Sequence, residues 1–134
     1  MSNKTPILVI DDELDVLKLV EFLLWNTEYE LIKASDAERG LQLVEETQPA
    51  VVIVDIMMPR MDGFTALQRI REIKADLPVI IFTARSTRSD EKKAEELGAN
   101  GFVAKPFNRQ KLLTAIERAI NPTGATISET ITEK

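Results

Sequence analysis

Four short runs of residues along this chain are apolar at every position, and a fifth segment mixes polar and apolar residues and reads as a short strand. The uninterrupted runs cover residues 7–10, 51–54, 79–82 and 101–104, and the mixed segment covers 30–34. A run that is apolar on both faces indicates a strand covered by helices on both sides, which is typical of parallel sheets. The pattern therefore predicts five strands, most of them fully buried.

Between these runs, apolar positions recur with the period of a helix. A first helix is predicted from about Leu14 to Trp25. Phe22 and Trp25 fall late in this helix, and we interpret them as core or half-buried side chains rather than partner contacts. The residues predicted to face inward are Leu14, Leu17, Val20 and Leu24.

Capping and turn residues frame the other elements. Capping boxes at Ser35/Glu38 and at Thr87/Asp90 predict helices that run to about Thr47 and about Leu97. The remaining signals are a helical pattern over 64–73, Pro78 as the first residue of a strand, Gly98 as a helix end, Asn108 as a helix cap, and a stop at Asn121-Pro122.

Five strands that alternate with five helices predict an α/β fold with a doubly wound, five-stranded parallel sheet. The chain has 134 residues, of which 44% are hydrophobic, enough for one core. We therefore expect one domain over residues 1–121. Residues 122–134 are rich in Thr and Ser and are expected to form a flexible tail.

Composition excludes several function classes. The chain contains no cysteine and no histidine, which rules out thiolate chemistry, Ser/His triads and a phosphohistidine on this chain. The net charge of -5 argues against direct nucleic-acid binding, which usually needs a basic face. Because no apolar run approaches membrane-spanning length, we expect a cytoplasmic protein without membrane insertion.

The four uninterrupted runs end on residues that can perform phosphate chemistry: Asp11-Asp12, Asp55, Thr83 and Lys105. The carboxyl ends of parallel strands share one edge of the sheet, where such folds place their binding site. Three carboxylates gathered there repel one another unless they take up protons or hold a cation. Oxygen ligands favour a hard ion such as Mg²⁺. A single Asp after a strand is also a common turn former.

A carboxylate beside Mg²⁺, a lysine and a threonine could accept a phosphoryl group as an acyl phosphate. Asp55 is the best candidate for this nucleophile. Taken alone, Lys105 could equally be a solvated surface residue, and Thr83 an ordinary strand residue. Lys105 is followed by a proline, and this peptide bond could be cis.

Together these residues resemble the receiver domain of two-component response regulators, the CheY-like family. The resemblance covers roughly residues 5 to 120, and the matching motifs are Asp11-Asp12-Glu13, Asp55 with Met58-Pro59 and Asp62-Gly63, Thr83-Ala84, and Lys105-Pro106-Phe107. It implies a flavodoxin-like sheet of order 2-1-3-4-5. It also implies that Asp55 receives phosphate from a histidine kinase or a phosphotransfer protein.

The resemblance further assigns the roles of single residues. Asp12 and Asp55 would bind Mg²⁺ directly, Asp11 would act mainly through a water, and the main-chain carbonyl of Met57 would be another ligand. Thr83 and Lys105 would contact the phosphoryl oxygens. Thr83 and Phe102 would form the switch, although Phe102 lacks the hydroxyl that many relatives carry as Tyr.

We therefore expect a single-domain phosphorelay protein with an unknown downstream protein target and no DNA-binding output domain. It would not be an enzyme beyond its own phosphorylation and dephosphorylation. The alternative is a receiver module of a larger hybrid kinase or multidomain effector. Haloacid-dehalogenase-like phosphatases and flavodoxins fit less well, because Asp11 and Asp12 are adjacent and acidic residues stand where a flavodoxin has its phosphate loop.

Three surface features bear on the output. Residues 99–102 lack the acidic pair found in OmpR-like relatives, so we expect a monomer or a weak phosphorylation-dependent dimer. Met57 and Arg85 flank the site and could tune the lifetime of the acyl phosphate. The mixed charges of the last two helices are interpreted as a solvated face rather than a docking surface.

Overall fold

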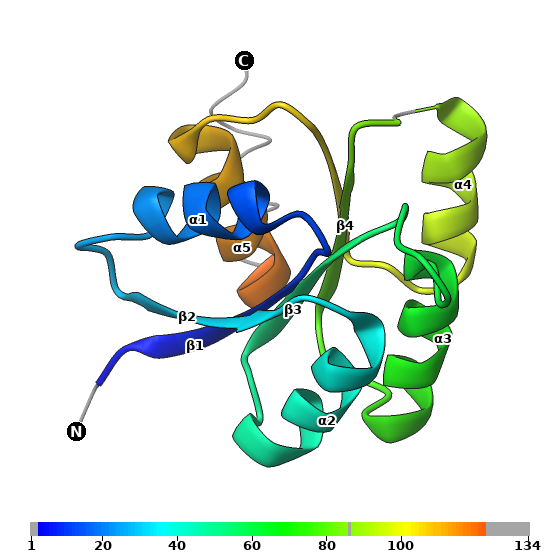
Figure 1. Ribbon diagram of the computed structural model, residues 1–134, viewed down its shortest axis with the longest axis horizontal. Helices are drawn as coiled ribbons and strands as arrows, with labels where there is room; N and C mark the ends of the chain where they lie inside the picture. The colour runs from blue at the N-terminus through cyan, green and yellow to red at the C-terminus, as the bar shows by residue number, and fades with distance from the viewer. Residues whose placement is uncertain (1–2, 86, 123–134) are drawn as a thin grey trace.

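The structure, a computed structural model, describes residues 3–85 and 87–122, in which five strands alternate with five helices (Figure 1). The sheet is parallel throughout, in the order β2-β1-β3-β4-β5, which confirms the predicted doubly wound fold. Residues 123–134, most of the predicted tail, lie outside the described residues. The elements are β1 (Thr5–Ile10), α1 (Leu14–Leu23), β2 (Tyr29–Ala34), α2 (Ala37–Thr47), β3 (Val51–Asp55), α3 (Gly63–Ile73), β4 (Val79–Thr83), α4 (Arg88–Glu96), β5 (Gly101–Ala104) and α5 (Arg109–Ile120).

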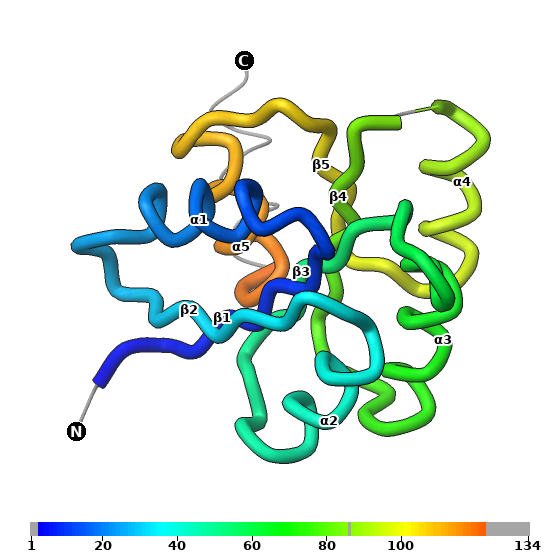
Figure 2. The backbone as a smooth tube through the Cα atoms, in the orientation of Figure 1, coloured from blue at the N-terminus to red at the C-terminus, as the bar shows by residue number. Residues whose placement is uncertain are grey.

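Helices cover both faces of the sheet. α1 and α5 pack on one face, and α2, α3 and α4 pack on the other (Figures 1 and 2). Along β1, Ile7 and Val9 pack under α1 and α5, while Leu8 and Ile10 pack under the opposite layer. This double coverage explains the absence of polar positions in the run. Within the described ranges, no helix is long and apolar enough to cross a bilayer.

Side-chain caps fix where most of the helices begin. The Thr87 hydroxyl accepts a hydrogen bond from the Asp90 backbone N–H at 3.0 Å, and the Asn108 side chain caps α5, both as predicted. The predicted cap at Ser35 is wrong. Asp36 caps α2 instead, because its carboxylate accepts a hydrogen bond from the Arg39 N–H at 2.7 Å and helical backbone begins only at Ala37.

Two of the expectations for α1 are also wrong. Leu14 is 62% exposed, since the first turn of α1 begins beyond the end of β1, where no sheet lies beneath it. Phe22 and Trp25 are 75% and 73% exposed, because α1 ends at Leu23 and the stripe that faces the sheet leaves both aromatic rings on the solvent side. The inward stripe is confirmed for Leu17, Val20 and Leu24.

Strand register brings the predicted functional strand ends to one edge. Ile10, which precedes Asp11, pairs with Val54, and Asp55 pairs with Phe82. Thr83 pairs with Ala104, directly before Lys105. β4 begins at Val79 rather than at Pro78, although the Pro78 carbonyl still accepts a hydrogen bond from the Val52 N–H at 3.0 Å.

One residue at a helix end adopts a backbone conformation that favours glycine. Gln48, at the end of α2, has a φ of 50° and a ψ of 62°. This left-handed region costs a residue with a Cβ about 1 kcal/mol relative to Gly. We expect Gln48→Gly to raise the free energy of unfolding by about 1 kcal/mol in urea titrations.

The control is Gln42→Gly, which replaces the same residue type inside the same helix. There glycine has no strain to relieve, and we expect a loss of about 1 kcal/mol. Equal destabilisation by both substitutions would contradict the assignment of strain to Gln48.

Candidate functional site

The carboxyl edge of the sheet gathers three buried polar side chains, one from the end of each central strand. Asp11 is fully buried, Asp55 is 3% exposed, and Thr83 is fully buried. The Asp11 backbone N–H donates to the Ala34 carbonyl at 3.0 Å, so the last residue of β2 holds the start of the β1–α1 loop. Asp12, the next residue, is exposed. The edge thus combines buried and accessible acid groups.

Lys105 links these carboxylates. Its ammonium lies 2.8 Å from Oδ2 of Asp11, 3.3 Å from Oδ2 of Asp55 and 3.5 Å from Oε1 of Glu13. The Lys105 side chain is only 11% exposed, and its backbone N–H donates to the Thr83 carbonyl at 2.8 Å. The peptide bond between Lys105 and Pro106 is cis. Lys105 is therefore a component of the site rather than a solvated surface residue.

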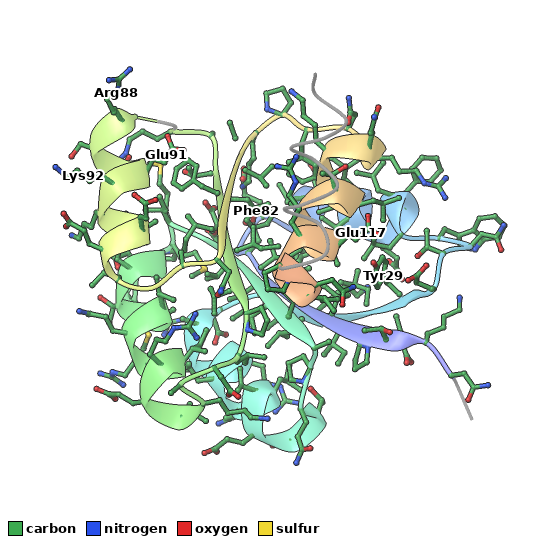
Figure 3. The ribbon with its side chains drawn as sticks, turned by 180° about the vertical axis from the view of Figure 1, so that it is seen from behind. Tyr29, Phe82, Arg88, Glu91, Lys92 and Glu117 are labelled. Atoms are coloured by element: carbon green, nitrogen blue, oxygen red, sulfur yellow. The ribbon has the colours of Figure 1, made fainter. Side chains whose placement is uncertain are left out.

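Two aromatic side chains, Phe82 and Phe107, pack near Lys105. Its ammonium lies 4.8 Å from the ring centroid of Phe82, close enough for a cation–π interaction. The Phe82 ring, labelled near the centre of Figure 3, is fully buried and lies 5.7 Å from the ring of Phe107. The Lys105 ammonium therefore contacts an aromatic ring as well as the carboxylates of Asp11 and Asp55.

Asp11, Asp12 and Asp55 each offer an oxygen, and these oxygens lie within 4.8 Å of one another. Two carboxylates at this distance repel by about 3 kcal/mol at an effective dielectric constant of about 20. A divalent cation would relieve this repulsion, and an all-oxygen ligand set suits a hard ion such as Mg²⁺. The cluster can therefore hold a metal ion, as the strand ends predicted.

Burial shifts the pKa values of these groups. Loss of hydration raises the pKa of Asp11, and Lys105 only partly offsets this. Burial also raises the pKa of Asp55, and the nearby charge of Asp11 adds to the effect. For Lys105 burial acts to lower the pKa, but its hydrogen bond to Asp11 and the two carboxylate charges outweigh this and raise it.

Gly63 fixes the backbone around Asp55. A Cβ at this position would lie 2.4 Å from the carbonyl oxygen of Asp55 and 2.7 Å from the Cα of Ile56. The Gly63 N–H also donates to the Ile56 carbonyl at 2.9 Å, while Asp62 caps α3 through the Thr65 N–H. Glycine is required here because α3 begins in direct contact with the chain that carries Asp55.

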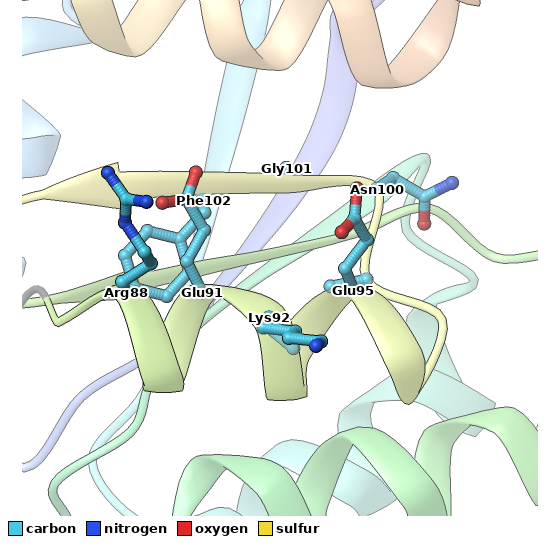
Figure 4. A pocket seen from close by; sticks show the side chains of 9 residues that line it. Arg88, Glu91, Lys92, Glu95, Asn100, Gly101 and Phe102 are labelled. Carbon is cyan, nitrogen blue, oxygen red and sulfur yellow. The ribbon is translucent and has the colours of Figure 1, made fainter.

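The structure also places the remaining predicted residues. Met57 is 52% exposed, and its N–H donates to Oδ1 of Asp55 at 3.3 Å. Phe102 is partly buried against α4, with its ring behind Arg88 and Glu91 in Figure 4. The roles predicted for the Met57 carbonyl and for Phe102 stay predictions.

Three residues of this region make contacts that the sequence does not predict. Glu13 lies near Lys105, and only its place in the acidic run after β1 hinted at this. Gly63 belongs to the Asp62-Gly63 motif, but its packing against Asp55 depends on tertiary structure. Asp90 was read as a helix-capping residue, but its carboxylate also pairs with Arg85.

A doubly wound parallel sheet with a carboxylate cluster, a hydroxyl and a lysine at its carboxyl edge defines a class of phosphate-handling α/β protein. The family model described as "Response regulator receiver domain" matches residues 7–117. The chain belongs to the family of response regulator receiver domains.

Similar proteins agree with this assignment. The chain is 37% identical over 130 residues to a probable transcriptional regulator ycf27 of Cyanophora paradoxa, covering 94% of this chain and 54% of that protein. The chain spans about half the length of the curated relatives it matches.

Solved structures show the same fold. A response regulator receiver domain protein from Clostridium thermocellum superposes with a TM-score of 0.83 at 35% identity, covering 90% of this chain and 97% of that one. The CheX-CheY-BeF3-Mg complex from Borrelia burgdorferi matches with a TM-score of 0.79 at 28% identity, covering 84% and 86%.

The close approach of Gly63 to Asp55 predicts the effect of adding one methyl group. Gly63→Ala forces the Asp55 backbone to move, so we expect a loss of about 1–3 kcal/mol in the free energy of unfolding and weaker binding of Mg²⁺. Gly101→Ala is the control, because its Cβ would meet only the Ile80 side chain, at 3.3 Å. Equal effects of the two substitutions on Mg²⁺ binding would refute the role of Gly63.

The raised pKa of Asp55 predicts a pH-dependent effect on stability in the absence of metal. Between the ordinary carboxyl pKa of 3.8 and the raised value, the folded state retains a proton that the unfolded state has lost. The contribution of protonated Asp55 to the free energy of unfolding is therefore full below pH 3.8, and it is lost as the pH rises through the pKa of Asp55 in the folded state. In EDTA, Asp55→Asn should become more stable than the wild type as pH rises from about 4 to 7.

Thermal unfolding at several pH values measures this difference, and Mg²⁺ at neutral pH should raise the melting temperature of the wild type more than that of Asp55→Asn. A stability difference that does not change with pH would contradict the assignment.

Proposed function

We propose that this protein is a phosphorylation switch in which Asp55 accepts a phosphoryl group from a histidine kinase or a histidine phosphotransfer protein. The observation that carries the proposal is the geometry at Asp55, which lies in a buried cluster of acid groups beside the ammonium of Lys105. These 134 residues contain no histidine, so a phosphohistidine donor lies outside this sequence.

In the transfer step, an Asp55 carboxylate oxygen attacks the phosphorus of the donor phosphohistidine in line with the bond to the imidazole. The phosphorus–nitrogen bond breaks, and its electron pair stays on the imidazole nitrogen. Because the other ring nitrogen of the donor imidazole carries a proton, the products are an acyl phosphate on Asp55 and a neutral histidine on the donor. Mg²⁺, when held by the acid cluster, would neutralise charge on the phosphoryl oxygens.

The residues around Asp55 then stabilise the acyl phosphate. Lys105, already 3.3 Å from Asp55, would pair with a phosphoryl oxygen. The Thr83 hydroxyl accepts a hydrogen bond from the Arg85 N–H at 3.1 Å, which leaves its own proton free to donate to a phosphoryl oxygen. Asp12 and the Met57 carbonyl would complete the Mg²⁺ ligands, with Asp11 acting mainly through a water. Hydrolysis of the acyl phosphate regenerates the Asp55 carboxylate, so the protein turns over no independent substrate.

An apolar rim beside the site suits a protein donor. Leu14 and Met57 are 62% and 52% exposed next to acidic residues, which is unusual for side chains of this size. A groove of about 310 Å³ adjoins Lys105. It is lined by Val16, Leu19, Ala84, Lys105, Pro106 and Phe107. A kinase or phosphotransfer protein in the cytoplasm would dock here and present its phosphohistidine to Asp55.

The output surface we propose is the groove between α4 and β5. It has a volume of about 440 Å³, and Figure 4 shows charged side chains of α4 at its rim and Phe102 behind them. Movement of Thr83 toward the phosphoryl group would let the Phe102 ring turn inward and change this groove. Identical Phe102 orientations in metal-free and beryllofluoride-bound crystals would contradict this step.

A second candidate is that the chain acts as the receiver part of a longer regulator. It is favoured by the curated relatives, which include probable transcriptional regulators and of which this chain covers 54% or less. The mass of the native protein, measured by antibody detection in its source, distinguishes this candidate from a single-domain protein of 15.1 kDa.

The proposed function predicts Mg²⁺-dependent labelling by acetyl phosphate at Asp55, located by mass spectrometry. Asp55→Asn should abolish the label, and Lys105→Ala should slow labelling by about tenfold or more, because a charged contact to the phosphoryl group is lost. Glu45→Gln, a surface change in α2, is the control and should label normally. Wild-type labelling of Asp55→Asn would sink the proposal.

A further inference from the structure

An ion pair that the phosphoryl-transfer chemistry does not use joins Arg85, two residues beyond β4, to Asp90 in the first turn of α4. Nε of Arg85 lies 2.8 Å from Oδ2 of Asp90, and Nη2 lies 3.2 Å from Oδ1, so the guanidinium binds both carboxylate oxygens. The Asp90 side chain is 11% exposed, while that of Arg85 is 54% exposed. The hydrogen bond from Arg85 is the main cause of the lowered pKa of Asp90.

Arg85 is also linked directly to the phosphorylation site. Its backbone N–H donates to the hydroxyl oxygen of Thr83 at 3.1 Å. Two residues span at most about 7 Å, so the Arg85 backbone stays close to the end of β4. β4 is the immediate neighbour of β3, the strand that ends at Asp55. The long Arg85 side chain therefore starts within reach of the phosphoryl position.

Phosphorylation changes the charge that this side chain experiences. An acyl phosphate carries about -1.5 to -2 charges in place of the single charge of the Asp55 carboxylate. Asp11, Asp12 and Glu13 already surround the position, and Lys105 supplies one positive charge to it. The Arg85 guanidinium would donate two charge-assisted hydrogen bonds to the phosphoryl oxygens, one from each of two nitrogens.

The position of Asp90 in the helix also stabilises its carboxylate. It lies in the first turn of α4, where the helix dipole stabilises a negative charge. Its backbone N–H donates to the Thr87 hydroxyl at 3.0 Å, a hydrogen bond that does not involve Arg85. The guanidinium can therefore leave without unmaking the helix cap.

We propose that Arg85 exchanges partners on phosphorylation, leaving the Asp90 carboxylate for the phosphoryl group on Asp55. In the unphosphorylated protein the Arg85–Asp90 pair holds the first turn of α4 close to the end of β4. In the phosphorylated protein Arg85 stabilises the acyl phosphate, and the first turn of α4 is released. This exchange rests on the proposed function, and it makes Asp90 a competitor of the phosphoryl group.

The test measures the affinity of the full chain for beryllofluoride in Mg²⁺ and the half-life of the acyl phosphate. The variants are Asp90→Asn, Arg85→Gln, the double variant and Arg85→Lys. Glu21→Gln is the control, because it removes an exposed ion pair with Lys33 at 3.2 Å on another part of the surface. Thermal unfolding is recorded for each variant.

Asp90→Asn should raise the beryllofluoride affinity about three- to tenfold, because Arg85 no longer has to leave a partner. Arg85→Gln should lower the affinity by a similar factor and shorten the half-life. The double variant should behave like Arg85→Gln, and Arg85→Lys should retain part of the affinity. Glu21→Gln should match the wild type.

The two single variants, Asp90→Asn and Arg85→Gln, are expected to change the beryllofluoride affinity in opposite directions. This result separates an exchange of partners from a purely structural ion pair. Loss of a structural pair would move both variants in the same direction. Changes of equal sign, or no change in Asp90→Asn, would overturn the inference. The wild type and Asp55→Asn report on the proposed function separately, because a wild type that binds no beryllofluoride would refute that function itself.

Discussion

The constraint that organises this protein is the burial of like charges at one edge of its sheet. Asp11 and Asp55 stand next to each other with almost no exposure to water, a state that burial and mutual repulsion both disfavour. The ammonium of Lys105 pairs with both of them, at 2.8 Å from Asp11 and 3.3 Å from Asp55. This arrangement stores unfavourable electrostatic energy that a bound divalent cation would release.

The rest of the fold holds this edge in place. The parallel register sets Asp55 level with Phe82, whose ring supports Lys105, and Gly63 lets α3 begin against the Asp55 backbone. At the neighbouring strand end, Thr83 and Arg85 connect the same edge to the first turn of α4. Under the proposed function, Arg85 would link the chemistry at Asp55 to the position of α4 through its contacts with Thr83 and Asp90.

The strands, the sheet and the acidic edge could be predicted from the sequence. The uninterrupted apolar runs indicate buried strands, and each run is followed directly by an acidic, hydroxyl or amine side chain. The sequence did not allow the exposure of Phe22 and Trp25 to be predicted, since periodicity alone does not show where α1 stops. The cap of α2 was misplaced by one residue because Ser35 and Asp36 are both good caps and backbone geometry decides between them. The Arg85–Asp90 pair was missed because surface charges of both signs are common near α4, and only coordinates show which of them meet.

Arg71 has a consequence for how α4 could move. From α3, its guanidinium donates to the carbonyls of Leu77 and Gly98 and to the side chain of Asn100, which also accepts from the Val79 N–H. These bonds tie down the carboxyl end of α4 and the start of β5, whereas the amino end of α4 is held by the Arg85–Asp90 pair. The carboxyl end of α4 is therefore held more firmly than its amino end. A small displacement near Thr83 would move the amino end of α4 relative to the groove, while the carboxyl end stays in place.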